Sequence, residues 1–183
     1  MTLNWLLAAI VVLTAAAAVT DWRTGHIPNL LIVIGLVSGV LLQLVLQISQ
    51  MDEAVDALAA FAVNVLGGAL ACAIVPLILY RLNALGGGDV KLLITVGAVA
   101  GPFIGLQLVI YSFVVAAIYG PVKLLYEGRL IRSFASAVRL TMNAFVPRER
   151  RRTIPAEALT SVRFGPLIFL AACLVAFLSW KSG

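Results

Sequence analysis

The sequence is poor in charge. Only 11% of its 183 residues are aspartate, glutamate, lysine or arginine, whereas 62% are hydrophobic, and the mean hydropathy is +1.08. A soluble domain needs many more polar side chains to cover its surface, so this composition excludes one. We therefore predict an all-α, polytopic membrane protein.

Histidine and cysteine are also scarce. The single histidine is His26, and the two cysteines, Cys72 and Cys173, lie inside long apolar runs, as is typical of small buried side chains. A lone histidine in a short loop is more typical of a surface residue than of a metal ligand or proton relay. The sequence gives no support to serine or cysteine catalysis, and we expect no metal or other cofactor.

Long hydrophobic runs are what the sequence has in abundance. Charge-free runs cover residues 1–20, 29–50, 57–80, 92–122 and 164–180, and about 20 apolar residues suffice to cross a bilayer. The fourth run is too long for one ordinary crossing. Gly101 and Pro102 interrupt it, so we predict separate helices at residues 89–100 and 103–122. The prediction is six transmembrane helices in a single membrane-embedded domain, residues 1–183.

The basic residues predict the orientation, because loops rich in lysine and arginine remain cytoplasmic. With six crossings, twelve of the thirteen fall on one side: Arg23, Arg81, Lys91 and nine from Lys123 to Arg163. We therefore expect both termini outside, and Asp21 and Asp89 at the cytoplasmic face. Topology and anionic lipid head groups account for the net charge of +5 without a nucleic-acid partner.

Residues 123–163 are predicted to form a basic cytoplasmic loop. Within it, Ile131, Phe134, Val138 and Phe145 recur at helical spacing, with Thr141 or Met142 between the last two. This pattern predicts an amphipathic helix on the inner leaflet. The alternative is a docking surface for an assembly partner.

Two aspartates lie at the margins of hydrophobic segments, where charge is costly and therefore typical of function. Asp89 follows Gly86, Gly87 and Gly88, and the absence of every Cβ in this triplet allows positive φ and close passage of another backbone. The alternative for Asp89, which would begin the helix, is a simple N-cap. The alternative for Asp21 is a solvated acid paired with Arg23.

As a pair, the two aspartates indicate acid–base chemistry. Carboxylates held close together cannot both ionise easily, so one keeps a proton while the other acts as a base. The base takes a proton from water and the acid donates one to the scissile carbonyl, which hydrolyses a peptide without a covalent intermediate. In the loop after Asp21, Pro28 fits a first-turn position and Asn29 can supply a side-chain hydrogen bond.

These residues resemble the type IV prepilin peptidase family of membrane aspartic proteases. Asp21, Arg23 and Ile27-Pro28-Asn29 match its first block, and Gly86 to Leu92 (GGGDVKL) match its GxGD signature with the lysine that follows. A weaker third match is Phe164-Gly165-Pro166. The resemblance implies that Asp21 and Asp89 are catalytic and that supporting roles belong to Gly86, Gly87, Gly88, Lys91, Arg23, Pro28 and Asn29.

The resemblance also implies a reaction and its partners. The expected substrates are type IV prepilins or pseudopilins, cut just before their apolar helix at the cytoplasmic face of a prokaryotic inner (plasma) membrane. Pilus or secretion assembly components are further expected partners. The chain lacks the soluble insert with paired CxxC motifs of the longer bacterial enzymes, so it is similar to the compact Tad/Flp-type form, and zinc is not expected.

Two other functions fit part of the sequence. A small proton-coupled transporter subunit would use membrane-edge carboxylates as a relay, but it would spread polar groups through the membrane depth, whereas both acids are predicted on one side. A non-catalytic scaffold of a pilus or secretion apparatus would dock partners on the basic loop. That function leaves the aspartates and the glycine triplet unexplained.

Overall fold

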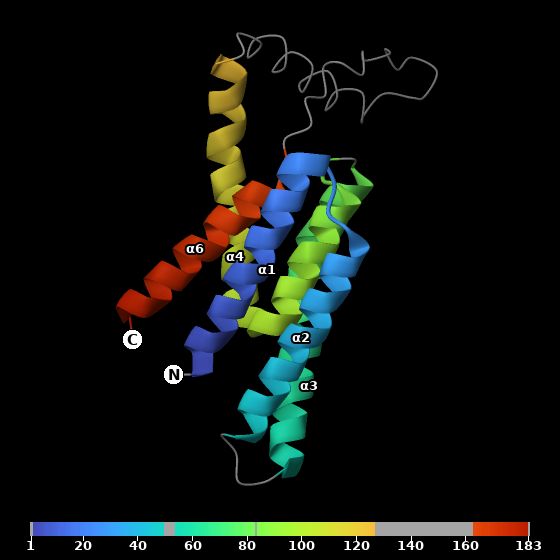
Figure 1. Cartoon of the computed structure of the whole chain (residues 1–183), viewed down its shortest axis with the longest axis vertical. Helices are drawn as coiled ribbons and strands as arrows, with labels where there is room; N and C mark the ends of the chain where they lie inside the picture. Colours follow the sequence, from blue (N-terminus) through green and yellow to red (C-terminus); the bar gives the residue numbers. More distant parts are fainter. Residues whose placement is uncertain (1, 50–53, 83, 127–162, 183) are drawn as a thin grey trace. The chain divides into compact units, whose positions relative to one another are not determined.

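A computed structural model describes residues 2–49, 54–82, 84–126 and 163–182. This part of the chain is all-helical, as predicted, with helices α1 (Thr2–Thr24), α2 (Asn29–Ile48), α3 (Ala54–Arg81), α4 (Gly87–Tyr126) and α6 (Gly165–Ser182) (Figure 1). The predicted interfacial helix lies outside the described residues.

The helices have the length and composition of membrane spans. Four of those described, α1 to α4, are long and apolar enough to cross a bilayer, and α6 is a shorter apolar helix over Gly165–Lys181. The chain is thus a membrane protein. The six crossings expected from the sequence remain a prediction, since α4 is one of the four candidates and contains two of the predicted helices.

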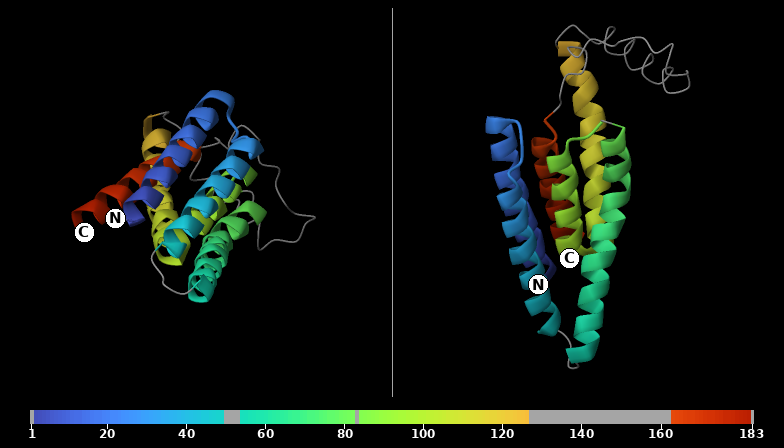
Figure 2. Two further views of the ribbon diagram at one scale, coloured as in Figure 1. Left: turned by 60° about the horizontal axis from the view of Figure 1, so that its bottom comes forward. Right: turned by 90° about the vertical axis from the view of Figure 1, so that its right-hand side faces the viewer.

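The interruption predicted at Gly101 and Pro102 is present inside α4. Gly101 has φ 79° and ψ 174°, a conformation that favours glycine. A Cβ added to Gly105 would lie only 2.9 Å from the Cα of Gly97, although eight residues of continuous helix span about 12 Å. The chain therefore doubles back at Gly101, and residues 102–115 return alongside residues 87–100 (Figure 2).

The first half of α4 forms much of the core. Leu92, Leu93, Val96 and Val99 are at most 1% exposed. Glycines bring the neighbouring helices close to this half: a Cβ on Gly39 of α2 would meet the Val99 side chain, and one on Gly68 of α3 would meet the backbone of Gly97. Cys72 of α3 is buried, as predicted, whereas Cys173 of α6 is only partly buried. This packing fixes the position of the helical segment whose first turn carries Asp89.

The chain divides into two compact units, which are described separately. One comprises residues 1–115 and 163–183, and the other residues 116–162, of which only the end of α4 is described. All site residues below belong to the first unit. A single domain for the whole chain stays a prediction.

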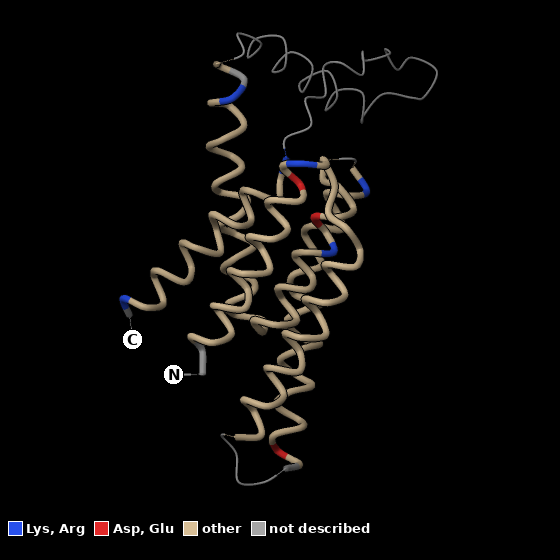
Figure 3. Tube along the Cα trace, in the orientation of Figure 1, with Lys and Arg blue, Asp and Glu red and all other residues tan. Residues whose placement is uncertain are grey.

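Charge is distributed unequally in the first unit. Basic residues gather at the end of the unit where α1 finishes and α6 begins: Arg23, Arg81, Lys91 and Arg163 (Figure 3). The far end of α3 carries Asp56, and the far end of α6 carries Lys181. This asymmetry is the one on which the predicted orientation depends; the orientation itself stays a prediction.

Candidate active site

Asp21 lies in the last turn of α1, where the helix ends in a glycine cap. Gly25 has φ 73° and its N–H donates to the Asp21 carbonyl at 2.9 Å, an arrangement that commonly terminates helices. The Asp21 side chain is only 6% exposed. Its Oδ2 accepts a hydrogen bond from the backbone N–H of Gly165 at 3.0 Å. Among the described residues Arg23 forms no ion pair, so the alternative pairing of Asp21 with Arg23 is not observed.

Gly165 is a site residue that the sequence reasoning missed. It begins α6, and a Cβ at this position would lie 2.8 Å from the Asp21 Cβ and 2.9 Å from its Oδ2. Real Cβ atoms essentially never approach so closely, so only glycine fits without displacement. The Phe164-Gly165-Pro166 match was the available signal, but nothing in the sequence alone connected it to Asp21.

Asp89 lies in the first turn of α4, two residues after the helix begins. The helix starts at Gly87 and the carbonyl of Gly86 accepts from the Val90 N–H at 3.2 Å. The prediction that Asp89 itself begins the helix, and the N-cap alternative, are therefore wrong. Asp89 occupies the third helical position, from which its carboxylate interacts with the Gly86 backbone N–H, as the acid of a capping box does.

The glycine triplet serves close packing rather than unusual dihedral angles. None of its members has positive φ, although glycine would allow it. A Cβ on Gly86 would lie 3.0 Å from Asp89 Oδ2, and one on Gly88 would lie 3.3 Å from the Ile27 Cβ, whereas one on Gly87 would lie an ordinary 3.4 Å from Tyr80. The variable position of GxGD is thus the one with room for a side chain.

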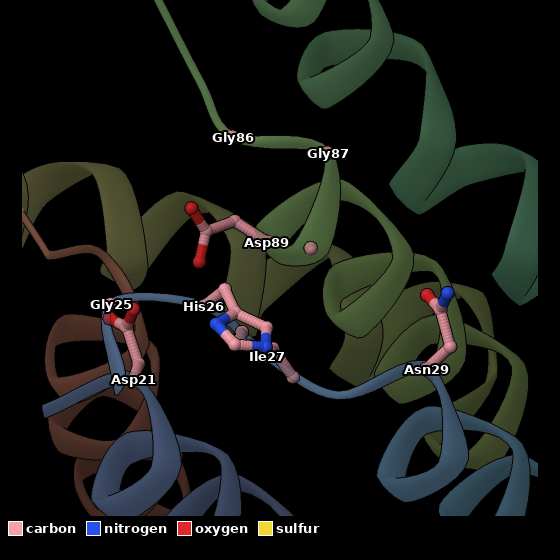
Figure 4. Close-up of a pocket in the computed structure, with 9 residues that line it drawn as sticks. Asp21, Gly25, His26, Ile27, Asn29, Gly86, Gly87 and Asp89 are labelled. Carbon is pink, nitrogen blue, oxygen red and sulfur yellow. The ribbon is translucent and has the colours of Figure 1, made fainter. Parts of the chain in front are cut away.

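The structure brings Asp21 and Asp89 together. Both line one cavity of about 210 Å³, whose other walls are the α1–α2 loop and the glycine triplet. Their carboxylates are close enough to interact electrostatically, and Figure 4 shows them pointing toward one another from α1 and α4. The cavity is large enough for several water molecules at about 30 Å³ each.

Lys91 and Asn29 support the cavity by bonding to each other. The Lys91 Nζ donates to Asn29 Oδ1 at 2.9 Å, which ties the N-terminal part of α4 to the start of α2. The side-chain hydrogen bond expected of Asn29 is therefore present. Pro28 was predicted in the first turn of α2 but is the N-cap instead. Its backbone is extended, with φ −63° and ψ 135°, while its carbonyl already accepts a hydrogen bond from the Leu31 N–H.

His26 lies where the sequence placed it, on the surface, but it also faces the aspartates. The residue is exposed and lines the cavity, and its ring lies beside the space between the two carboxylates (Figure 4). No group of three or more His, Cys, Asp or Glu side chains gathers to hold a metal in the part of the chain that the structure describes.

Two carboxylates that line a cavity large enough for water provide an acid and a base for hydrolysis. The sequence profile of the Type IV leader peptidase family matches residues 7–121, which include Asp21, the glycine triplet and Asp89. No curated protein and no solved structure matches the chain significantly. Since the profile covers more than half of the chain, the protein belongs to the Type IV leader peptidase family, a family of proteases.

Proposed function

We propose that this protein is a membrane aspartic endopeptidase that removes the leader of type IV prepilins or pilin-like precursors. The observation that carries the proposal is the cavity shared by Asp21 and Asp89, two residues that come from different helices and both fall within the family match. No other described pair of acids faces a common cavity in this way.

The mechanism needs only water and the two carboxylates. The ionised aspartate removes a proton from a water molecule in the cavity while the protonated one donates to the scissile carbonyl oxygen. The resulting tetrahedral intermediate collapses when the first aspartate passes the proton it took from water to the leaving amine and the second takes a proton back from a hydroxyl of the intermediate. The C–N bond breaks, the leader is released and the dyad again holds one proton. Burial of Asp21 against Gly165 and of Asp89 against Gly86 holds both groups in position for each step.

The supporting residues shape the cavity rather than react. Gly86 and Gly88 allow Asp89 and the α1–α2 loop to approach, and the Lys91–Asn29 hydrogen bond holds α4 against the start of α2, where Pro28 is the N-cap. Gly87 completes the triplet wall, and Arg23 is exposed and does not line the cavity. An extended substrate backbone would pass along the triplet, where few side chains obstruct it.

The site belongs at the cytoplasmic face of a prokaryotic inner membrane, with both termini outside. There a prepilin presents its leader at the interface and its apolar helix within the bilayer, so the scissile bond arrives at the height of the aspartates. The basic residues beside the site support this orientation. Membrane lipids and assembly components are the other proposed partners.

Co-expression with a prepilin from the same genome tests the proposal. Leader removal, followed as a gel shift, should occur with the wild type and be abolished by Asp21→Asn and by Asp89→Asn at equal membrane expression. Asp56→Asn is the matched control, since Asp56 lies in the first turn of α3, away from the cavity. Processing by either active-site variant at the wild-type level would contradict the proposal.

A further inference from the structure

The start of α6 contacts the end of α1 at consecutive residues. The Gly165 N–H donates to Asp21, and one η nitrogen of the Arg163 guanidinium donates to the carbonyl of Trp22. The same guanidinium lies over the Trp22 ring, 5.9 Å from its centroid. Residues 163–165 therefore hold both the side chain of Asp21 and the carbonyl of the next residue, Trp22.

We infer that the segment Arg163–Gly165 is a clamp that positions Asp21, in which Arg163 acts through Trp22 as a positioning residue. The inference rests on the proposed function, because it concerns the geometry of the proposed dyad. All basic residues of its loop share a general role in setting the orientation of the chain. Arg163 has this further role at Asp21.

The hydrogen bond from the Gly165 N–H to Asp21 satisfies a backbone donor at the start of α6. The first N–H groups of a helix have no partner within it, and Pro166 has no N–H at all. Phe164, which precedes α6, offers no polar side chain as a cap, although its carbonyl accepts from the Leu167 N–H at 3.0 Å. The Asp21 carboxylate thus caps α6 from another helix through Oδ2, which leaves Oδ1 without this constraint.

The clamp is itself anchored on the opposite side. Phe164 is 8% exposed and its ring packs against Phe113 of α4, with centroids 5.4 Å apart. A buried residue between Arg163 and Gly165 fixes the direction in which both reach α1. Because Arg163 is exposed, its guanidinium can be changed without opening the core.

Arg163 combines two contacts that a lysine reproduces only in part. A planar guanidinium donates in its plane while its face lies on an aromatic ring, whereas an ammonium group is a flexible point charge. We therefore expect Arg163→Gln to lower kcat about tenfold with KM unchanged, as loss of a hydrogen bond from a charged donor would. Arg163→Lys should recover part of that loss.

The experiment compares purified full-length variants cleaving a synthetic prepilin peptide. Arg163→Gln is matched by Arg81→Gln, which removes an exposed basic residue at the same end of the unit. Gly165→Ala is matched by Gly67→Ala, where an added Cβ has room. We expect Gly165→Ala to lower kcat by about 100-fold, since an active-site displacement of about 1 Å can cost that much, and both controls to retain wild-type kinetics.

A second readout does not depend on the substrate. The carboxyl ¹³C resonance of Asp21, assigned with Asp21→Asn, should shift in Gly165→Ala and Arg163→Gln and stay unchanged in both controls. Wild-type kcat and an unshifted resonance in Arg163→Gln, with thermal unfolding confirming that it folds, would overturn the clamp. If the wild type cleaves no prepilin, the proposed function fails, and the resonance comparison still decides whether the clamp exists.

Discussion

Adding one methyl group at Gly86 tests the proposed position of Asp89 with the smallest possible change. In Gly86→Ala the new Cβ would lie 3.0 Å from Asp89 Oδ2. Because few real Cβ contacts are shorter than 3.4 Å, the carboxylate must retreat by a few tenths of an ångström. The backbone is not the obstacle, since Gly86 does not have positive φ.

The displacement predicts a moderate loss of rate. If about 1 Å of misplacement costs roughly 100-fold, a shift of a few tenths should lower kcat by about fivefold, with KM nearly unchanged. Stability should change little. Alanine is a poorer N-cap than glycine by a few tenths of a kcal/mol or more, but it also restricts the unfolded chain by about 0.4–1 kcal/mol, and these effects oppose each other.

Gly87→Ala is the matched comparison. Its Cβ would lie at an ordinary 3.4 Å from Tyr80, and alanine is a better helix former than glycine by up to about 1 kcal/mol. We expect a kcat nearer to the wild-type value than that of Gly86→Ala, and equal or higher thermal stability. The assay is steady-state cleavage of a prepilin peptide by each purified variant, with unfolding followed by circular dichroism. A larger loss of kcat in Gly87→Ala than in Gly86→Ala would refute this reasoning.

Three further predictions concern the surroundings of the site. Lys91→Met should remove the hydrogen bond to Asn29. The free energy of unfolding should fall by about 1 kcal/mol or less because the bond is exposed, and a much larger loss would contradict this. Gly97→Val should destabilise the fold by about 1–3 kcal/mol, since even its Cβ would lie 2.6 Å from Cys72 Sγ. Unchanged thermal unfolding would show that α3 and α4 are not so close. Deletion of residues 148–152 should alter membrane orientation more than chemistry, as measured by cysteine labelling from each side; loss of cleavage with unchanged labelling would contradict that.

The fold was predictable where hydropathy and local backbone chemistry decide it. The apolar runs predicted the helices, and Gly101 followed by Pro102 predicted the break inside α4, because proline cannot continue the hydrogen bonding of a helix and glycine can adopt φ 79°. The start of α4 was placed two residues too late. A glycine N-cap is harder to recognise than an aspartate one, and Asp89 was mistaken for it.

The candidate site was predictable only in part. Its two aspartates were found because charge beside lipid is costly and because their flanking residues resemble a known family. The contact of Asp21 with Gly165 joins residues 144 positions apart, and no local pattern specifies which helix end meets which. The role of Arg163 was hidden for the same reason: its charge was visible in the sequence, but its contacts with Trp22 depend on how α6 meets α1.

Single-turnover cleavage of a prepilin by the purified protein tests the central proposal most directly. Excess enzyme in detergent micelles is mixed with the precursor, and mass spectrometry follows the leader and the mature product. We expect one cut before the apolar helix by the wild type and none by Asp21→Asn or Asp89→Asn, although both variants unfold cooperatively. Cleavage by either variant at the wild-type rate would contradict it.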